Sequence, residues 1–225
     1  MTTEQETKSS QFANGDIDRS NRWRYQLIIM AAALLAFALG YYLSGGPSPG
    51  PDSAEVGFAR DMSQHHRQAV EMSTLIYNRT DDEIIRILAY DILTSQQAQI
   101  GIMGGWLDAW GHSWFDMGPR MEWMGMSVEG RMPGMASPDE VNMLRDANGI
   151  DAEIIFLQLM IPHHQSGVMM AQAAADRARV PYVRDLAQGM ANAQDAEIEY
   201  MRDLLRERGV ESTEDPAATE MDMDG

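Results

Sequence analysis

The 225-residue sequence contains no cysteine, and this absence sets the first limits on what the protein does. A chain without thiols has no disulfide framework, no zinc–thiolate finger and no catalytic cysteine. A phosphate-binding glycine loop, a nucleophile elbow and a convincing Ser/His/Asp pattern are missing as well. The sequence therefore offers no catalytic constellation, and we predict that the protein is not an enzyme.

Net positive charge is also missing. Residues 1–44 carry four basic and four acidic side chains, so the whole formal net charge of −17 falls on the rest of the chain. Nucleic-acid phosphates are bound by clusters of Lys and Arg, so we expect no nucleic-acid partner. The acidity is compatible with cation uptake, although acidity alone more often serves solubility.

Only one long apolar run is present, from Leu27 to Leu43. With Tyr25 and Gln26 before it, the run is just long enough to cross a bilayer core of about 30 Å. Arginines precede the run and none closely follows it, which orients its N-terminus toward the cytoplasm. We predict a single-pass cell-membrane anchor that holds the following domain outside the cytoplasm, on the periplasmic or extracellular face.

A cleaved signal peptide is the alternative to this anchor. The region before the apolar run is long for a signal peptide, and no clear small-residue cleavage site follows the run. Both features favour an uncleaved signal anchor. Either alternative places the chain after residue 45 outside the cytoplasmic membrane.

The rest of the chain is predicted to be helical apart from one central stretch. Thr80 and Ser137 each have a glutamate three residues later, which predicts capping boxes at two helix starts, and Pro162 is expected to bend a third helix. The predicted helices span about 53–78, 80–109, 137–147, 151–177 and 181–208. The predicted domains are a cytoplasmic disordered tail (1–24), the transmembrane anchor (25–43), a linker (44–53), a helical bundle (54–209, with hairpins 54–109 and 151–208 and connecting loop 110–136) and an acidic disordered tail (210–225).

Methionine is abundant, with 19 residues, about two to three times its usual share. Two stretches place a pair of adjacent histidines between methionines at the same offsets, and they hold four of the five histidines. These residues are Met62, His65, His66 and Met72 in the first stretch and Met160, His163, His164 and Met170 in the second.

The two stretches belong to an internal repeat. A shift of 98 residues, without gaps, aligns residues 58–107 with 156–205 and superposes both His-His pairs. Two helical hairpins related in this way are expected to pair about a pseudo-two-fold axis. The sequence therefore predicts an all-α fold, a four-helix bundle made of two repeated hairpins, with the transmembrane helix in addition.

The inward-facing stripes of the helices can be read from the same repeat. Steps of four and three residues place His65 and His163 on the core stripe, and their neighbours His66 and His164 about 100° round the helix, at its edge. Gly167, like its counterpart in the first copy, would leave space beside the imidazole. The stripes of the second helices add four mid-bundle polar residues, Gln96, Gln99, Gln194 and Glu197, and two further candidate methionine ligands, Met103 and Met201.

These patterns have two interpretations, packing and metal binding. In the first, His65 and His163 are ordinary core histidines hydrogen-bonded to Gln96 and Gln194. In the second, imidazole and thioether groups bind a metal, and the polar residues of the facing helices support the ligands, since buried polar groups without partners cost a few kcal/mol. The repetition of both the doublets and their methionine spacing favours metal binding.

The ligand types select among metals. Di-iron bundles use Glu-x-x-His on facing helices, whereas this chain has Met62-x-x-His65 and Met160-x-x-His163. Thioether sulfur is soft and favours Cu(I), or its mimic Ag(I), over iron. Zinc accepts imidazole but gains little from thioether. We therefore predict Cu(I), with Zn or Fe as weaker candidates.

The central loop is a weaker candidate for metal binding. It is rich in glycine and carries six methionines within nineteen residues, which we expect to have little core to pack against. The alternative is a hydrophobic flap over the bundle end. The loop candidates are Met117, Met121, Met124, Met126, Met132, Met135 and His112, and Met221 and Met223 in the tail are weaker still.

The repeated Met-x-x-His-His pattern, Met160-Ile-Pro-His-His-Gln and Met132-Pro-Gly-Met-Ala-Ser-Pro-Asp-Glu together resemble the bacterial family called domain of unknown function 305. The resemblance covers about residues 54–208. It implies a ferritin-like four-helix fold in a secreted or membrane-anchored protein, with copper binding and copper tolerance in some members. The implied ligands are the four histidines and four methionines of the two stretches. The central loop departs from the family in having a single histidine, His112.

Three functions follow as hypotheses. The first is a membrane-anchored extracytoplasmic protein that binds Cu(I) for copper buffering, tolerance or delivery, with a copper transporter or cuproprotein as partner. The second is a ferritin-like redox metal enzyme, which would need inward carboxylates, and only Glu197 lies well placed. The third is a metal-free scaffold or sensor module. The sequence leaves open whether the two doublets form one shared site or two.

Overall fold

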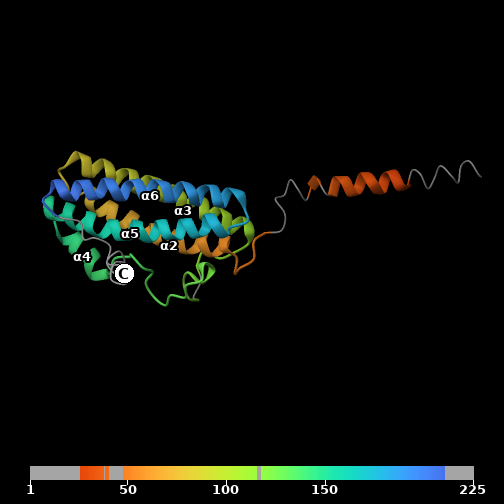
Figure 1. Cartoon of the computed structure of the whole chain (residues 1–225), viewed down its shortest axis with the longest axis horizontal. Coiled ribbons are helices and arrows are strands. Elements are labelled where there is room, and N and C mark those ends of the chain that lie inside the picture. The colour runs from red at the N-terminus through yellow and green to blue at the C-terminus, as the bar shows by residue number, and fades with distance from the viewer. Residues whose placement is uncertain (1–25, 38, 41–47, 116–117, 211–225) are drawn as a thin grey trace, which may run out of the picture. The chain divides into compact units, whose positions relative to one another are not determined.

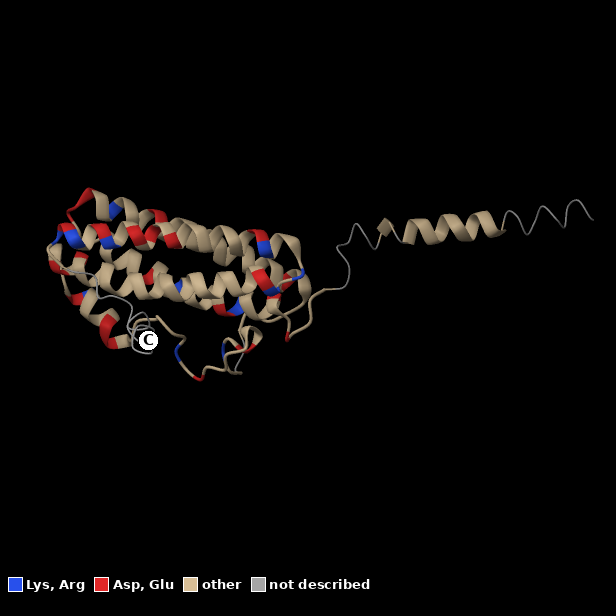
Figure 2. Cartoon of the chain, in the orientation of Figure 1, with Lys and Arg blue, Asp and Glu red and all other residues tan. Residues whose placement is uncertain are grey.

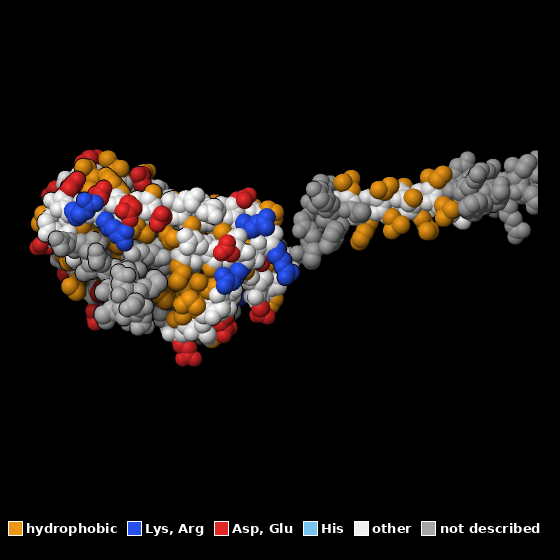
Figure 3. All heavy atoms as spheres, viewed as in Figure 1, with side chains coloured by type: hydrophobic (Ala, Val, Ile, Leu, Met, Phe, Trp, Pro, Cys, Tyr) orange, Lys and Arg blue, Asp and Glu red, His pale blue; other side chains and the backbone are white. Residues whose placement is uncertain are grey.

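The computed structural model describes residues 26–37, 39–40, 48–115 and 118–210 (Figure 1). The chain divides into two compact units, residues 1–48 and 49–225. In the first unit residues 26–37 and 39–40 are helical, and their exposed side chains are mainly apolar (Figure 3). No helix among the described residues is long and apolar enough to cross a membrane. The predicted anchor over 25–43 stays a prediction, and five of its positions lie outside the described residues. The predicted tail 1–24 lies outside them as well, and so does the predicted tail 210–225 apart from residue 210.

The second unit is helical, as predicted. Its elements are α2 (Ala54–Tyr77), α3 (Glu83–Trp110), the 3-10 turn η1 (Glu122–Met124), α4 (Pro138–Asp146), α5 (Gly149–Arg177) and α6 (Pro181–Glu207). Each predicted helix is present with its ends displaced by three residues or fewer, and α5 continues through Pro162. The described residues hold no strand, only one isolated bridge between Arg120 and Val128.

The helix starts confirm one predicted capping box and correct the other. Ser137 and Glu140 form the reciprocal capping box at the start of α4. At α3 the N-cap is Asp82, whose side chain accepts hydrogen bonds from the first-turn backbone. Thr80 lies two residues before this N-cap, where its hydroxyl accepts a hydrogen bond from the Asp82 N–H at 3.0 Å and donates one to Glu153 on α5 at 2.6 Å. Thr80 thus supports the turn before α3 and contacts α5, while Asp82 caps the helix.

The four long helices pair as two hairpins, α2 with α3 and α5 with α6, which meet through α2 and α5 (Figure 1). Two buried glutamates tie the hairpins together at opposite ends. Glu55 on α2 accepts hydrogen bonds from the N–H groups of Arg179 and Val180, in the turn between α5 and α6, at 2.5 and 3.1 Å. Glu153 on α5 contacts Thr80, in the turn between α2 and α3. Each hairpin therefore holds the turn of the other, as antiparallel helices related by the predicted pseudo-two-fold require.

A polar layer divides the bundle core into two apolar clusters. Along α2 and α5 each His-His pair lies between a methionine of one cluster and a methionine of the other, so sulfur flanks the layer on both sides. The buried methionines of the bundle helices are Met72, Met160 and Met201 in one cluster and Met62, Met103, Met170 and Met190 in the other.

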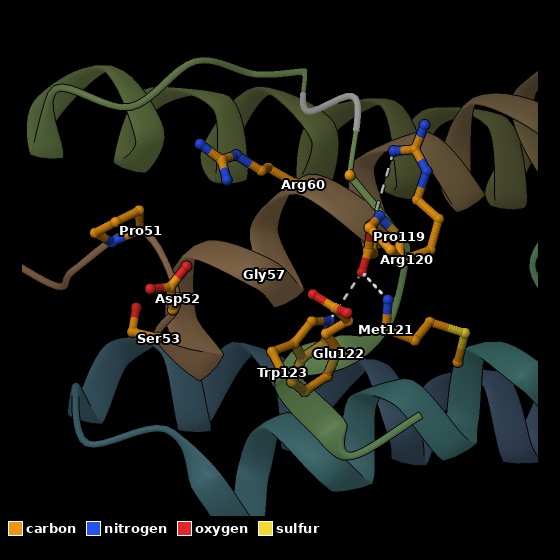
Figure 4. Close-up of a pocket in the computed structure, with 12 residues that line it drawn as sticks. Pro51, Asp52, Ser53, Gly57, Arg60, Pro119, Arg120, Met121, Glu122 and Trp123 are labelled. Atoms are coloured by element: carbon orange, nitrogen blue, oxygen red, sulfur yellow. Dashed lines mark hydrogen bonds and ion pairs between the residues drawn. The ribbon is translucent and has the colours of Figure 1, made fainter. Parts of the chain in front are cut away.

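The connecting loop packs on the second cluster. Met121, Met124 and Met132 are buried there, so the expectation that loop methionines lack a core is wrong for these three. Asp61 on α2 holds the loop, since it accepts hydrogen bonds from the Met121 N–H at 2.8 Å and the Trp123 indole N–H at 2.9 Å (Figure 4). Through these three methionines the loop packs against one half of the bundle core, and a metal-binding role for the loop stays a prediction.

Candidate metal centre

The four repeated histidines lie in one buried layer. The rings of His65 and His163 face each other across the α2–α5 contact, with centroids 3.7 Å apart and ring planes inclined by 32°. The centroids of neighbouring rings within each doublet are 6.5 Å and 6.2 Å apart. The two doublets therefore form one shared constellation rather than two separate ones.

All four rings are fully buried, which corrects one expectation. His66 and His164 are 0% exposed, although the helical spacing places them at the edge of the core stripe. Helices α3 and α6 cover this edge, and each supplies a polar side chain to it. The Nε2–H of His66 donates to Gln99 Oε1 at 2.7 Å, and the Nε2–H of His164 donates to Glu197 Oε2 at 2.8 Å.

These hydrogen bonds determine which ring nitrogen carries the proton. Carbonyl and carboxylate oxygens only accept, so Nε2 is the protonated nitrogen in His66 and His164. The same holds for His163, whose Nε2–H donates to the backbone oxygen of His65 at 3.2 Å. In a neutral ring whose Nε2 carries the proton, the lone pair is on Nδ1. Within the described residues the Nδ1 atoms of these three histidines are buried and have no hydrogen-bond partner, and neither has either ring nitrogen of His65.

Two glutamine oxygens add to this set of unpaired acceptors. Gln96 and Gln194 are 3% exposed, and the Oε1 atom of each lies without a hydrogen-bond partner in the described structure. The packing interpretation, in which these amides satisfy His65 and His163, is therefore not what the structure shows. The space expected at Gly167 holds the Gln194 amide, because a Cβ at this glycine would lie 2.1 Å from Oε1.

Burial keeps the imidazoles of His65, His66 and His163 neutral. It lowers the pKa of His65 and His163 well below the ordinary 6.5, with a further lowering from the neighbouring histidines. Burial also lowers the pKa of His66 to about 3, against the opposing effect of its hydrogen bond to Gln99. Neutral imidazoles are the form that binds metal ions, so these ligands need not lose protons near neutral pH.

The metal-free protein is expected to lose stability as the pH falls below about 6.5. The unfolded chain protonates His65, His66 and His163 near that value, whereas the folded chain does so only at much lower pH. Between the two values the unfolded state binds more protons, so each histidine costs about 1.4 kcal/mol per pH unit. Above pH 6.5 this penalty is absent.

Urea unfolding in the presence of a chelator measures this effect. The range from about pH 7.5 to about pH 5.5 stays above most carboxylate titrations. A free energy of unfolding that stays constant across this range would contradict the neutral state of the buried rings.

The predicted methionine ligands of the bundle lie on both sides of the layer. Met62, Met72, Met160 and Met170 are 0% exposed, as are Met103 and Met201 on α3 and α6. No group of three or more His, Cys, Asp or Glu side chains in the described part of the chain is arranged to hold a metal. The groups that this layer offers a metal are imidazole and thioether, a combination that suits a soft ion.

The loop candidates are not brought to the layer as a group. His112 donates from Nε2 to the Pro49 backbone oxygen at 2.8 Å, at the end of α3. Met126 is 37% exposed, Met135 is half-buried, and Met117 lies outside the described residues. The hollow between the start of α2 and loop residues 118–123 is lined by Met121 but by none of the four layer histidines (Figure 4).

Sequence reasoning missed three residues that position these elements, namely Glu55, Asp61 and Glu153. Glu55 and Glu153 are 98 residues apart, the same shift as the repeat, just outside the aligned stretch. That shift is the signal that could have found them. Asp61 has no such signal, because its partners lie in a loop without periodicity.

Comparison with solved structures gives close and distant matches. A DUF305 protein from Streptomyces coelicolor is 48% identical, with a TM-score of 0.70 over 74% of this chain and 100% of that one. A DUF305 fragment from Deinococcus radiodurans is 32% identical, with a TM-score of 0.58 over 72% and 99% of the two chains. CopM in its Cu(I)-bound form is 23% identical, with a TM-score of 0.52 over 69% and 96%, a likeness of fold alone.

No curated protein matches the chain. The family described as domain of unknown function 305 (DUF305) matches residues 55–205, which span both hairpins and all four layer histidines. With the two similar DUF305 structures, this match confirms the resemblance found in the sequence, and the chain belongs to the DUF305 family.

Proposed function

We propose that the protein binds Cu(I) in its histidine layer and buffers or delivers copper outside the cytoplasm. One observation carries the proposal. The layer concentrates buried acceptor atoms, imidazole Nδ1 and amide Oε1, that have no hydrogen-bond partner in the described structure. Leaving a buried acceptor unpaired costs about 1–3 kcal/mol. A bound cation would satisfy several such atoms at once.

The flanking sulfur atoms support a soft, monovalent cation. Buried thioethers occupy both sides of the layer, and thioether prefers Cu(I) to harder ions. CopM, which shares the fold, has structures in Cu(I)-bound and Ag-bound forms. We infer a binding protein rather than an enzyme, anchored to the cell membrane by residues 25–43, with a copper transporter or cuproprotein as the partner that supplies or receives the ion.

A metal titration tests the proposal. The fragment 49–225 forms a compact unit of its own. It is titrated with Ag(I), Cu(I), Zn(II) and Fe(II) beside the variant His65→Ala/His163→Ala. We expect a dissociation constant for Ag(I) and Cu(I) of roughly micromolar or tighter, and its loss in the double variant.

The alternatives give different results in the same experiment. Absence of soft-metal binding at this strength, or equal binding by the double variant, overturns the proposal. Iron binding with iron-dependent oxygen consumption would favour a redox enzyme. If no metal binds and the double variant is less stable than the wild type, the histidines have a structural role and the scaffold hypothesis is favoured.

A further inference from the structure

The two copies of the repeat differ in charge at one position beside the histidine layer. Gln99 on α3 and Glu197 on α6 are related by the 98-residue shift. Each accepts a hydrogen bond from a histidine Nε2–H, at 2.7 Å from His66 and 2.8 Å from His164. The hydrogen bond to the Gln99 amide is therefore no longer than the one to the Glu197 carboxylate. Holding an imidazole in place therefore does not require the negative charge of Glu197.

The buried carboxylates Glu55, Asp61 and Glu153 have partners outside the histidine layer. Asp61 holds the loop and lies 4.0 Å from Arg120, and Glu153 lies 2.8 Å from Arg208. Glu55 accepts two backbone N–H groups at the opposite end from Glu153. Along the middle of the long helices few charged residues are drawn (Figure 2). In the described part of the chain, Glu197 is the acidic side chain that hydrogen-bonds to a layer histidine.

Counting charges in the layer shows what this carboxylate does for a bound ion. Imidazole, amide and thioether ligands are all neutral. A monovalent cation beside His164 and the one carboxylate sum to zero, whereas a divalent cation leaves one positive charge uncompensated. The four rings are 0% exposed, and an unpaired charge in such surroundings is strongly disfavoured.

The exposure of Glu197 explains how the metal-free protein tolerates the charge. Its side chain is 26% exposed, while the ring of His164 is fully buried. The carboxylate therefore reaches solvent on one side and contacts the layer on the other. Its charge needs no counter-ion when no metal is bound, and it acts on a metal through a single imidazole ring.

We infer that Glu197 supplies the one negative charge that balances a bound monovalent soft cation in the histidine layer, and that a divalent cation would need a second carboxylate there. The inference rests on the proposed metal binding and deepens it. Glu197 is a positioning residue for His164, and its charge sets the net charge of the occupied layer. Gln99, at the repeat-related position, is its neutral counterpart.

Charge variants at the two related positions test the inference in the 49–225 fragment. Glu197→Gln keeps an acceptor for His164 and removes the charge. Gln99→Glu adds a second charge at the other end of the layer, and Gln99→Glu/Glu197→Gln moves the single charge across the pseudo-two-fold. Competition titrations with Ag(I) and Zn(II) give the ratio of the two affinities, and thermal unfolding of the metal-free variants reports on the fold.

We expect Glu197→Gln to weaken Ag(I) binding about 10- to 100-fold, the usual effect of losing an outer partner of a metal-bound histidine. Gln99→Glu should shift the affinity ratio at least about tenfold toward Zn(II), because two carboxylates match a divalent charge. The swapped variant should recover most of the Ag(I) preference, which a merely structural role for Glu197 would not predict.

The outcomes separate this inference from the proposed function. The inference about charge fails alone if two results occur together. The ratio of Ag(I) to Zn(II) affinity is then the same in Glu197→Gln, Gln99→Glu and the wild type, and His65→Ala/His163→Ala does not bind metal. Wild-type protein that binds no Ag(I) would overturn both. If Glu197→Gln fails to fold, the ratio measured for Gln99→Glu decides, and an unchanged ratio there counts against the inference.

Discussion

Replacing His65 and His163 together by leucine is expected to stabilise the metal-free protein by about 2 kcal/mol and to abolish Ag(I) binding. The two facing rings bury three ring nitrogens that have no partner in the described structure, and each such atom costs about 1–3 kcal/mol. Leucine is close to histidine in volume and has no polar atom, so the layer would lose this penalty. A binding site thus lowers the stability of the empty fold.

Denaturant unfolding in chelator, followed by Ag(I) titration, measures both effects. The matched control is His112→Leu, because this ring lies outside the layer and bonds to the Pro49 backbone. The control should bind Ag(I) like the wild type. A metal-free His65→Leu/His163→Leu protein that is less stable than wild type would show that the histidines serve packing, as the scaffold alternative requires.

Replacing Arg208 by methionine is expected to cost about 3–5 kcal/mol, the usual effect of removing one partner of a buried ion pair. The side chains of Arg208 and Glu153 are each 8% exposed and lie 2.8 Å apart. The guanidinium also reaches Asp82, the N-cap of α3, at 2.7 Å. The Arg208 guanidinium therefore joins the end of α6 to α5 and α3. Without it, the buried Glu153 carboxylate keeps only the hydrogen bond from the Thr80 hydroxyl within the described structure.

Two comparisons sharpen this prediction. Arg202→Met removes a pair with Glu199 whose side chains are 30% and 69% exposed, and such pairs contribute about 0–1 kcal/mol. Glu153→Gln/Arg208→Met removes both buried charges and should recover much of the loss. Urea unfolding of the three variants gives the free energies, and equal losses for Arg208→Met and Arg202→Met would contradict the buried pair.

The fold was predictable because its signals are local and repeated. Helix periodicity and the 98-residue shift both indicate the same pair of hairpins, and the capping box at Ser137 marks the start of α4. The structure confirms all three predictions. The prediction failed at Thr80, because Asp82, two residues later, caps α3. The Thr80 hydroxyl also donates to Glu153 on a distant helix, and a contact between residues 73 positions apart leaves no trace in a local pattern.

The connecting loop shows the same limit more strongly. Its glycines and methionines predicted an irregular segment, and the structure has one. The burial of Met121, Met124 and Met132 depends on the groove that the assembled bundle offers. It also depends on Asp61, which looks like any surface acid in the sequence. Irregular backbone has no period, so a sequence pattern cannot say which of its side chains face inward.

The sequence by itself determined the helices, their pairing and the four histidines with their methionine neighbours, because each follows from spacing along one helix or from the repeat. Only the tertiary structure decided that the two doublets form one layer, that His66 and His164 are as buried as His65 and His163, and that the Oε1 atoms of Gln96 and Gln194 do not pair with the layer histidines. These facts depend on how four helices close around a common centre. Their distances are set by packing across the bundle, which periodicity along one helix does not record.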